Sequence, residues 1–298
     1  MHAPAYSNGR GHGAARQGDP APAERVVLIH CSASSARQWD VLTGELSGYH
    51  AVAPDLYGHG KRPRWHGDGA LTLAHEAAAI WNVFPEGEPF HLVGHSYGGA
   101  VTLRFALSFR ERVRSLTLIE PSAFHILTDR TDAQVRALSE IQAVADTINR
   151  AVLCGDYRGG MEVFIDYWGG PGSWHNTPDE RKAQFAALAV CVANHFWSLV
   201  GETTRLSACR DIQVPTLLLC GTNSPGPSKL IASLLADAIP HAQHRVIHGA
   251  GHMSPLTHPT QVNALILEHL RHHGAQNPQP PFGSTRFASI SGALVQVL

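Results

Sequence analysis

Residues 90–109 read FHLVGHSYGGAVTLRFALSF, and this stretch decides how the chain folds. Its first residues, Phe90–Gly94, form a short apolar run of the kind found in strands buried on both faces of a sheet. From about Gly99 onward the apolar residues recur at helical spacing. Between the two lies Gly94–Gly98, which has the pattern G-x-S-x-G. A strand, a tight turn and a helix in this order predict one unit of a parallel sheet covered by helices.

The serine at the centre of this turn, Ser96, has the setting that a nucleophile requires. A hydroxyl is a weak nucleophile, so it must be presented on a tight turn where a base can reach it. The flanking glycines permit the strained backbone, and the helix N-terminus supplies a positive field where an oxyanion would develop. We therefore predict that Ser96 is a nucleophile. The alternative is a chance serine in a glycine-rich loop.

Five other apolar runs have the length and composition of buried strands. They are Val26–His30, His50–Pro54, Ser115–Glu120, Pro215–Gly221 and His244–Gly249. Helical spacing occurs in Arg37–Ser47, Thr72–Trp81 and Thr260–His272. Alternating strands and helices predict an α/β fold, with a mostly parallel central sheet flanked by helices on both faces.

One long segment interrupts this alternation. Between Glu120 and Pro215 the chain has helical patterns, at Asp132–Leu153 and Thr177–Ala193, and no convincing strand. A structureless loop of that length is improbable in a compact domain, so an inserted helical cap is the better interpretation. The expected parts are a disordered tail over 1–24, a core over 25–121 and 206–273, a helical cap over 122–205, and a C-terminal tail over 274–298.

The composition excludes several classes of protein. With 298 residues and 44% hydrophobic content, the chain can bury a large core. Its 23 basic and 24 acidic residues form no basic stripe and no polybasic helix, so we expect no nucleic-acid and no membrane partner. No apolar run reaches the ~18 residues of a spanning helix, and the N-terminus lacks the apolar stretch of a secretory signal.

The cysteine and histidine content indicates a site without a metal. The five cysteines are odd in number and none forms a C-x-x-C pair, which fits a reducing, cytoplasmic setting. The 20 histidines include no H-E-x-x-H and no obvious ligand spacing, so solvated or structural histidines are the better interpretation. We therefore expect no metal and no cofactor, a small-molecule substrate as the partner, and we leave a homodimer open.

A second candidate lies far downstream, in Gly249–Met253 (GAGHM), between the last predicted strand and the last predicted helix. A loop at that edge of the sheet can carry the imidazole of His252 back over Ser96 as a general base. The alternative is a loop histidine that only hydrogen-bonds to backbone, which is common in so histidine-rich a chain.

Six segments together resemble the α/β-hydrolase superfamily, in the form with a helical cap that is similar to small esterases and related acyl hydrolases. They are VVLIHCSASS, PDLYGHG, LVGHSYGGAVTLRFA, LTLIEPSAF, VPTLLLCGT and GAGHMSPLTHP, and they span Val26 to about Leu270. The resemblance implies an α/β-hydrolase fold and a triad in the chain order serine, acid, histidine, and it specifies no substrate.

The chain departs from this family at the triad acid. The family usually places the acid in a G-x-x-D pattern after the strand equivalent to residues 216–220, whereas this chain has Gly221-Thr222-Asn223-Ser224. Asp211 precedes its strand and should lie at the wrong end of the sheet. Glu120 closes the next strand after the nucleophile, where some members of the family, haloalkane dehalogenases among them, carry the acid. We assign the acid to Glu120; the alternative is a carboxylate that caps a helix or anchors the cap.

The oxyanion loop departs from the family as well. Where His-Gly is common, this chain has His30-Cys31-Ser32. We predict that the oxyanion is bound by the backbone N–H groups of Tyr97 and Ser32. Cys31 is rejected as a second nucleophile, because nothing in its surroundings obviously lowers its pKa.

Aromatic residues in and before the cap are candidates for a pocket that suits a small, mainly apolar substrate. These candidates are Phe124, Phe164, Trp168 and Trp197. The alternative is that they form the core of the cap. Nearer the strands, we interpret His95, Asp55 and His59 as structural and expect His30 to hydrogen-bond to loop backbone.

These assignments predict a serine hydrolase that cleaves a carboxylic ester or a related acyl compound through an acyl-enzyme on Ser96. A serine in place of aspartate disfavours dehalogenase and epoxide-hydrolase chemistry in the families that this chain resembles. The same triad would serve a C–C bond hydrolase, a thioesterase or a perhydrolase. A non-catalytic ligand-binding protein on a hydrolase scaffold is the remaining alternative, motivated by the missing acid after Gly221.

Overall fold

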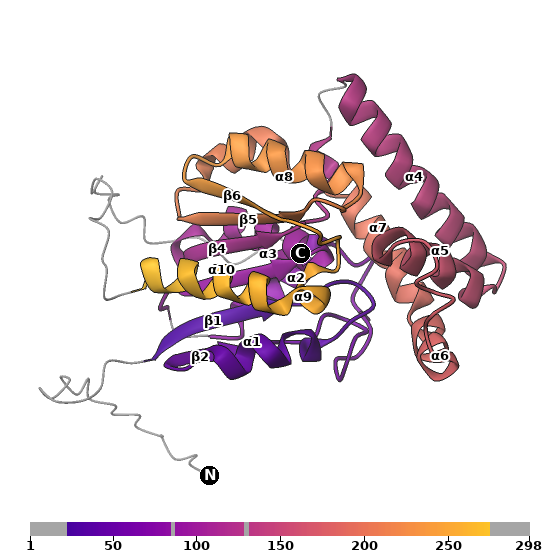
Figure 1. Cartoon of the computed structure of the whole chain (residues 1–298), viewed down its shortest axis with the longest axis horizontal. Helices are drawn as coiled ribbons and strands as arrows, with labels where there is room; N and C mark the ends of the chain where they lie inside the picture. Colours follow the sequence, from indigo (N-terminus) through magenta and orange to yellow (C-terminus); the bar gives the residue numbers. More distant parts are fainter. Residues whose placement is uncertain (1–22, 85–86, 128–130, 275–298) are drawn as a thin grey trace, which may run out of the picture.

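The computed structural model describes residues 23–84, 87–127 and 131–274, and within them six strands form one sheet (Figure 1). The strands are β1 (Glu24–Ile29), β2 (Tyr49–Val52), β3 (Phe90–His95), β4 (Val113–Ile119), β5 (Thr216–Gly221) and β6 (Ala242–Ile247). Their order across the sheet is β2-β1-β3-β4-β5-β6, and every neighbouring pair is parallel. The predicted α/β fold is confirmed, and all six carboxyl ends lie at one edge.

The chain changes direction across the sheet at β1. Strand β2 is added on one side of β1 and β3 on the other. At such a switch point the loops that leave the two strands run apart and open a crevice outside the carboxyl ends. Ser32 follows β1 and Ser96 follows β3, so both residues border this crevice.

Helices cover both faces of the sheet (Figure 1). Those on one face are α1 (Asp40–Glu45) and α10 (Pro259–His272). Those on the other face are α2 (Leu73–Trp81), α3 (Tyr97–Ser108) and α8 (Gly226–Ala238). Short helical segments lie at Ala36–Trp39, Arg110–Arg112, Phe124–Ile126, Leu206–Asp211 and α9 (Ser254–Thr257).

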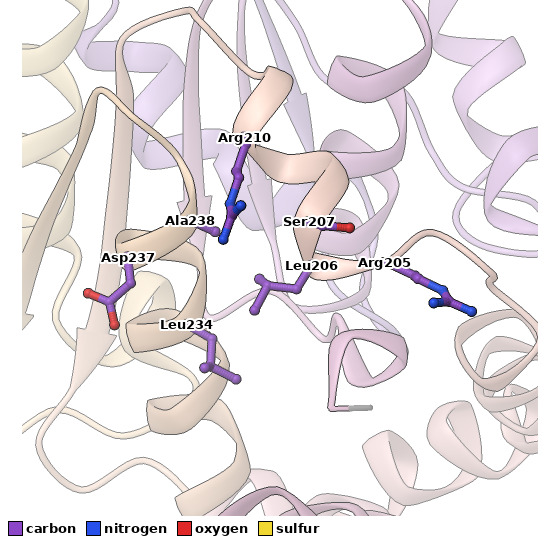
Figure 2. A pocket seen from close by; sticks show the side chains of 7 residues that line it. All are labelled: Arg205, Leu206, Ser207, Arg210, Leu234, Asp237 and Ala238. Carbon is purple, nitrogen blue, oxygen red and sulfur yellow. The ribbon is translucent and has the colours of Figure 1, made fainter. Parts of the chain in front are cut away.

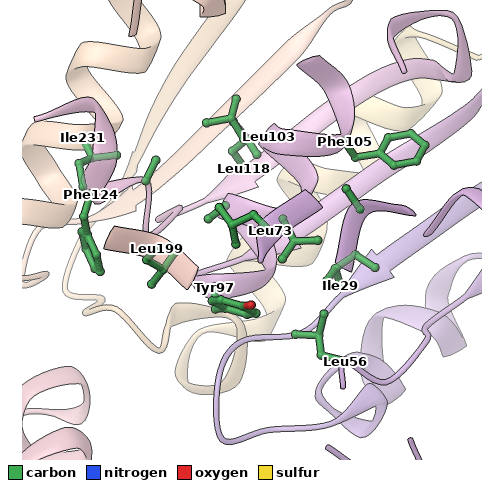
Figure 3. Packing of buried hydrophobic residues seen from close by; sticks show 14 of the residues in the cluster. Ile29, Leu56, Leu73, Tyr97, Leu103, Phe105, Leu118, Phe124, Leu199 and Ile231 are labelled. Atoms are coloured by element: carbon green, nitrogen blue, oxygen red, sulfur yellow. The ribbon is translucent and has the colours of Figure 1, made fainter. Parts of the chain in front are cut away.

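Each face of the sheet has its own apolar core. Under α1 and α10, a cluster that includes Leu28, Trp39 and Ile266 is buried. On the other face, a larger cluster includes Leu103 and extends without interruption to Leu199 of the inserted helices (Figure 3). Because apolar contacts of this kind are the main stabilising term in folding, the insertion is held on the core by the same cluster that covers the sheet.

The insertion between β4 and β5 is helical and lies beyond the carboxyl edge of the sheet (Figure 1). Its helices are α4 (Asp132–Leu153), α5 (Tyr157–Gly169), α6 (Asp179–Ala187) and α7 (Ala189–Val200). The single helix expected over Thr177–Ala193 is wrong: the chain bends by 49° between α6 and α7. At the break the Leu188 N–H donates to the Phe185 carbonyl, a three-residue bond that ends the α-helical ladder.

Within the part of the chain that the structure places, no single helix is long and apolar enough to cross a membrane. Taken together across their bend, α6 and α7 reach that length and composition.

The helix after the G-x-S-x-G turn begins earlier than its apolar pattern indicates. It starts at Tyr97, immediately after Ser96, and not near Gly99. A Cβ at Gly98 would collide with the carbonyl oxygens of Ile29 and His30, so the missing side chain lets the first helical turn lie against the end of β1. Gly98 and Gly99 carry no side chain, so the spacing of apolar residues could not show that the helix begins at Tyr97.

The two predicted tails fall almost entirely outside the described residues. Strand β1 begins at Glu24, one residue inside the tail expected over 1–24, and Glu24 pairs with Tyr49 of β2. Gly274 is the last residue described, so the expectation for the tail over 274–298 concerns residues beyond the described chain.

Glu76 of α2 has a buried carboxyl group and is not one of the residues that border the crevice. It is 1% exposed, its Oε1 accepts the Tyr57 N–H at 3.2 Å, and its Oε2 has no partner among the described residues. Burial raises the pKa of Glu76 to about 7, although Arg62 and the Tyr57 N–H act in the opposite direction. The folded protein therefore favours the neutral carboxyl.

We expect Glu76→Gln to raise Tm at pH 8 and to leave it near the wild-type value at pH 5. The raised pKa means that stability is lost as pH rises from the ordinary value of 4.5 through about 7. The neutral amide avoids that loss, which is roughly 3 kcal/mol at full ionisation. Thermal unfolding at the two pH values checks this, and an equal Tm difference at both would contradict it.

Candidate active site

Ser96 lies in a sharp turn between β3 and α3. Its φ of 56° is in the left-handed region that L-residues rarely adopt. Its backbone N–H donates to the Ile119 carbonyl of β4 at 2.9 Å, which holds the turn against the neighbouring strand. A Cβ at Gly94 would lie 2.5 Å from the Gly98 carbonyl oxygen, so this turn requires glycine there. The hydroxyl is thereby lifted out of the sheet toward the crevice.

Three side chains from three separate loops meet at this point. His252 Nε2 lies 2.9 Å from Ser96 Oγ, and His252 Nδ1 lies 2.8 Å from Glu120 Oε2. All three side chains are buried. In this arrangement the imidazole can take the hydroxyl proton while the carboxylate stabilises the imidazolium. The structure thus brings together the three residues that the sequence singled out.

Glu120 follows β4 directly and is completely buried. Its Oε1 accepts hydrogen bonds from the Gly221 N–H at 2.9 Å and from the Ser224 hydroxyl at 2.5 Å. Burial acts to raise the pKa of Glu120, but the contacts with His252, Ser224 and the Gly221 N–H outweigh it and hold the pKa below its ordinary value. The carboxylate therefore carries its negative charge at neutral pH.

Ser224 explains how the loop after β5 functions without a carboxylate. It occupies the last position of Gly221-Thr222-Asn223-Ser224, where the family pattern has aspartate, and it is buried. From this position it donates a hydrogen bond to Glu120. Sequence reasoning missed this role. The available signal was a donor side chain at the usual acid position, paired with a glutamate that ends the neighbouring strand.

Backbone strain is concentrated around these residues. Among the described non-glycine residues, those with positive φ are Ala33, Ser96 and Glu120, at 55°, 56° and 43°. They belong to the loop after β1, the turn after β3 and the end of β4. Each such conformation costs on the order of 1 kcal/mol or more and persists only where neighbouring contacts enforce it. Their coincidence at one edge of the sheet supports that edge as the candidate functional site.

The loop after β1 is held by side chains from other segments. The Cys31 N–H donates to Gln38 Oε1 at 2.9 Å, and the Ala33 N–H donates to His59 Nε2 at 3.2 Å. Between them, the Ser32 N–H has no acceptor within the described part of the chain. His59, expected to be structural, therefore fixes the loop whose central N–H is left available to a ligand.

The second predicted donor is the N–H of Tyr97, the first residue of α3. The first N–H groups of a helix have no acceptor within the helix and carry a partial positive charge. Tyr97 also follows Ser96 directly, so its N–H is adjacent to the hydroxyl that would attack a carbonyl. The binding of an oxyanion by the Tyr97 and Ser32 N–H groups stays a prediction.

Two buried histidines, His95 and His30, form hydrogen bonds to the loops around the site. His95 Nε2 donates to the main-chain carbonyl of His252 at 2.9 Å, and its Nδ1 accepts from the Gln38 amide at 3.1 Å. His30 Nδ1 donates to the Cys31 carbonyl at 2.7 Å, as expected for a histidine bonded to loop backbone. Burial lowers the pKa of His95 to about 3 and that of His30 to about 4, so both are neutral.

Cys31 borders the same cavity as Ser96 but lacks the properties of a nucleophile. Burial raises the pKa of its thiol to about 12, which leaves it protonated. In the placed residues, no group of three His, Cys, Asp or Glu side chains is arranged to hold a metal ion. Ser96 lines this cavity and contacts an imidazole that is itself held by a carboxylate, Glu120.

A cavity of about 300 Å³ opens over Ser96 and His252, below the inserted helices. Phe164 and Trp168 of α5 line it, and the Trp168 ring lies on His252 with centroids 4.1 Å apart. A smaller cavity of about 20 Å³ also reaches Ser96 and is lined by Phe124. Three of the four predicted pocket residues therefore line cavities that reach Ser96, namely Phe124, Phe164 and Trp168.

The fourth predicted pocket residue, Trp197, is not part of this site, and that prediction was wrong. Its side chain is 63% exposed and lines a separate cavity of about 450 Å³. The preceding residue, Phe196, is buried and lines the small cavity at Ser96. Successive helical residues point about 100° apart, so one of the two neighbours turns away when the other faces the site.

Another cavity, of about 550 Å³, lies between α8 and the segment Leu206–Asp211 (Figure 2). Its charged residues Arg205, Arg210 and Asp237 are all exposed. It includes none of the residues that meet at Ser96. The candidate site is therefore the cavity of about 300 Å³ over Ser96, where a hydroxyl, an imidazole and a carboxylate are in contact.

The fold and this contact of three side chains define the class of protein, an α/β hydrolase. The sequence profile of the alpha/beta hydrolase family matches residues 26–265, and the chain belongs to that family. Membership identifies it as a hydrolase.

Relatives of the chain include a lipase and an esterase. The chain is 36% identical over 273 residues to lipase LipV of Mycobacterium tuberculosis, covering 86% of this chain and 96% of the lipase. It is 27% identical over 253 residues to a pimeloyl-acyl-carrier-protein methyl ester esterase of Aeromonas salmonicida, covering 81% and 93%. It shares its fold with MGS-M2, an α/β hydrolase from a Medee basin deep-sea metagenome library, at a TM-score of 0.70 and 15% identity, covering 90% and 94%.

Proposed function

We propose that the protein hydrolyses a carboxylic ester in two steps through an acyl-enzyme on Ser96. The observation that carries the proposal is the pair of contacts from His252, at 2.9 Å to Ser96 and 2.8 Å to Glu120. His252 takes the hydroxyl proton as Ser96 Oγ attacks the ester carbonyl carbon, and gives it to the leaving alcohol as the C–O bond breaks. Water then attacks the acyl carbon while His252 takes its proton; the bond from that carbon to Ser96 Oγ breaks, His252 returns the proton to Ser96 Oγ, and the acid leaves.

Two sets of fixed groups favour the charges that develop in these steps. Glu120 accepts from His252 Nδ1, which keeps Nε2 free to receive the proton and stabilises the imidazolium that forms. The Ser32 and Tyr97 N–H groups bind the carbonyl oxygen as it becomes an oxyanion. Such preorganised donors usually contribute the largest electrostatic term in acyl transfer.

The cavity over Ser96 suits a short and mainly apolar acyl or alcohol group. Its walls include Phe164, Trp168 and Phe185 from the cap and Leu256 from α9. Arg181 is the one lining residue of the described set with a Lys, Arg, Asp or Glu side chain. A volume of about 300 Å³ is at the small end for ligand sites, so long chains would extend into solvent.

We expect a series of p-nitrophenyl esters to show the highest kcat/KM for butyrate or hexanoate and a much lower value for palmitate. The reason is that apolar burial stops increasing once the acyl chain has filled the cavity. Initial rates with purified protein measure this. Equal rates for palmitate and butyrate would contradict the proposed substrate size.

A fluorophosphonate probe separates catalysis from the binding-protein alternative. Labelling of Ser96 in the folded wild-type protein, located by peptide mass spectrometry, is expected because the probe needs an activated serine. Absence of both labelling and ester hydrolysis would favour a ligand-binding protein. Parallel assays with thioester and diketone substrates distinguish the thioesterase and C–C hydrolase alternatives, which share the triad.

We place this reaction in the cytoplasm, with a small molecule and water as the reactants. All five cysteines are free thiols, and four of them are buried. Unpaired cysteines are typical of a reducing compartment.

A further inference from the structure

Four rings form a buried column between the cap and the loop after β1. His195 of α7 stacks on Tyr97 with centroids 3.6 Å apart and planes 4° apart. His195 also stacks on His59, with centroids 4.9 Å apart and planes 18° apart, and the ring centroids of His59 and His30 are 5.5 Å apart. A residue of the cap is thus in ring contact with two residues of the core.

His195 also forms a hydrogen bond to the same loop. Its Nδ1 lies 2.8 Å from Ser32 Oγ, a contact between residues 163 positions apart in sequence. The side chain is 2% exposed, and its Nε2 has no partner among the described residues. Burial, followed by the neighbouring His59 and His30, lowers the pKa of His195 well below its ordinary value. The imidazole is therefore neutral and acts through geometry and hydrogen bonding.

His195 thus touches both residues whose backbone N–H groups face the reacting carbonyl in the proposed mechanism. It holds Ser32 through a hydrogen bond and Tyr97 through ring contact. The other fixed points of the loop, from Gln38 and His59, act on Cys31 and Ala33, one on each side of Ser32. The Ser32 side chain is held by His195, a residue of the cap.

We propose that His195 is a positioning residue that sets the oxyanion hole, so that α7 of the cap completes the catalytic machinery of the core; this rests on the proposed function. A displacement of about 1 Å at such a site can cost on the order of 100-fold in rate. The donors stabilise the oxyanion far more than the neutral ground-state carbonyl, so the loss falls on kcat and leaves KM nearly unchanged.

The test is His195→Phe, which keeps a flat buried ring and removes the hydrogen bond to Ser32. We expect kcat for a p-nitrophenyl ester to fall about 10- to 100-fold with KM changed less than about threefold. Affinity for a trifluoromethyl ketone, which forms a tetrahedral adduct with the serine, should fall by the same factor as kcat/KM. His195→Asn, whose amide can still bond to Ser32, should recover part of the lost kcat.

Ser32→Ala removes the same hydrogen bond from the other side and keeps the backbone N–H. The double variant His195→Phe/Ser32→Ala should be no slower than the slower single variant, because both changes remove one interaction. Trp197→Ala, two residues along α7 on the exposed side, is the matched control and should retain wild-type kcat.

The outcomes separate this inference from the proposed function. Wild-type kcat in His195→Phe, or additive losses in the double variant, would overturn the positioning role while leaving ester hydrolysis intact. If His195→Phe does not fold, Ser32→Ala decides: a lower kcat at unchanged KM supports the role, and unchanged kcat overturns it. A wild-type protein that neither labels with fluorophosphonate nor hydrolyses esters would overturn the proposed function, and this inference with it.

Discussion

Ser96→Ala is expected to lower kcat for p-nitrophenyl butyrate by about 10⁴- to 10⁶-fold. His252 Nε2 contacts Ser96 Oγ at 2.9 Å, and removal of that oxygen leaves the base with no nucleophile to activate. The fold should persist, since alanine can replace serine in the same backbone conformation and the Ser96 N–H still bonds to β4. Equal Tm values for the two proteins would confirm that the loss is chemical.

Ser122→Ala is a suitable control for this variant. Its hydroxyl lies 3.2 Å from Ser96 Oγ and forms no hydrogen bond with His252 or Glu120 in the described structure. We expect a loss below about tenfold, the effect of one neutral hydrogen bond. If Ser96→Ala kept more than about 1% of wild-type kcat, the nucleophile would have to be another residue.

Glu120→Gln is expected to lower kcat by about 10³- to 10⁴-fold with little change in KM. The amide oxygen can still accept from Gly221 and Ser224, so the amide NH₂ turns toward His252 Nδ1. His252 must then accept at Nδ1 and carry its proton on Nε2, where it cannot take a proton from Ser96. A kcat near the wild-type value would show that Glu120 is not the triad acid.

The position of the acid can be tested further through the loop after β5. Asn223→Asp adds a carboxylate next to the usual acid position, but the Asn223 side chain is exposed and bonds to the Gly249 carbonyl. We expect this variant to keep a kcat similar to wild type. In contrast, Ser224→Asp introduced into Glu120→Ala places a carboxylate at the family's usual position and should recover part of the lost kcat.

Much of the fold could be predicted because strands and helices leave local patterns. The apolar run before Ser96 and the helical spacing after it indicate the central unit, and repetition of that unit indicates a parallel sheet. The carboxyl ends of parallel strands lie at one edge of the sheet. Because Glu120 and His252 each follow a predicted strand, the sequence also predicted that they would lie near Ser96. The structure places them in contact.

What only the tertiary structure decided is which side chains make the contacts between distant segments of the chain. Trp197 points outward while its neighbour Phe196 points in, and the apolar pattern of α7 gives no preference between two large aromatics. Ser224 as a donor to Glu120 and His195 as a partner of Ser32 join segments that are far apart in sequence. Periodicity specifies which residues can share a face, whereas the residue that reaches a given atom depends on how whole helices pack against the sheet. That packing is a property of the assembled core and is not encoded in any one segment.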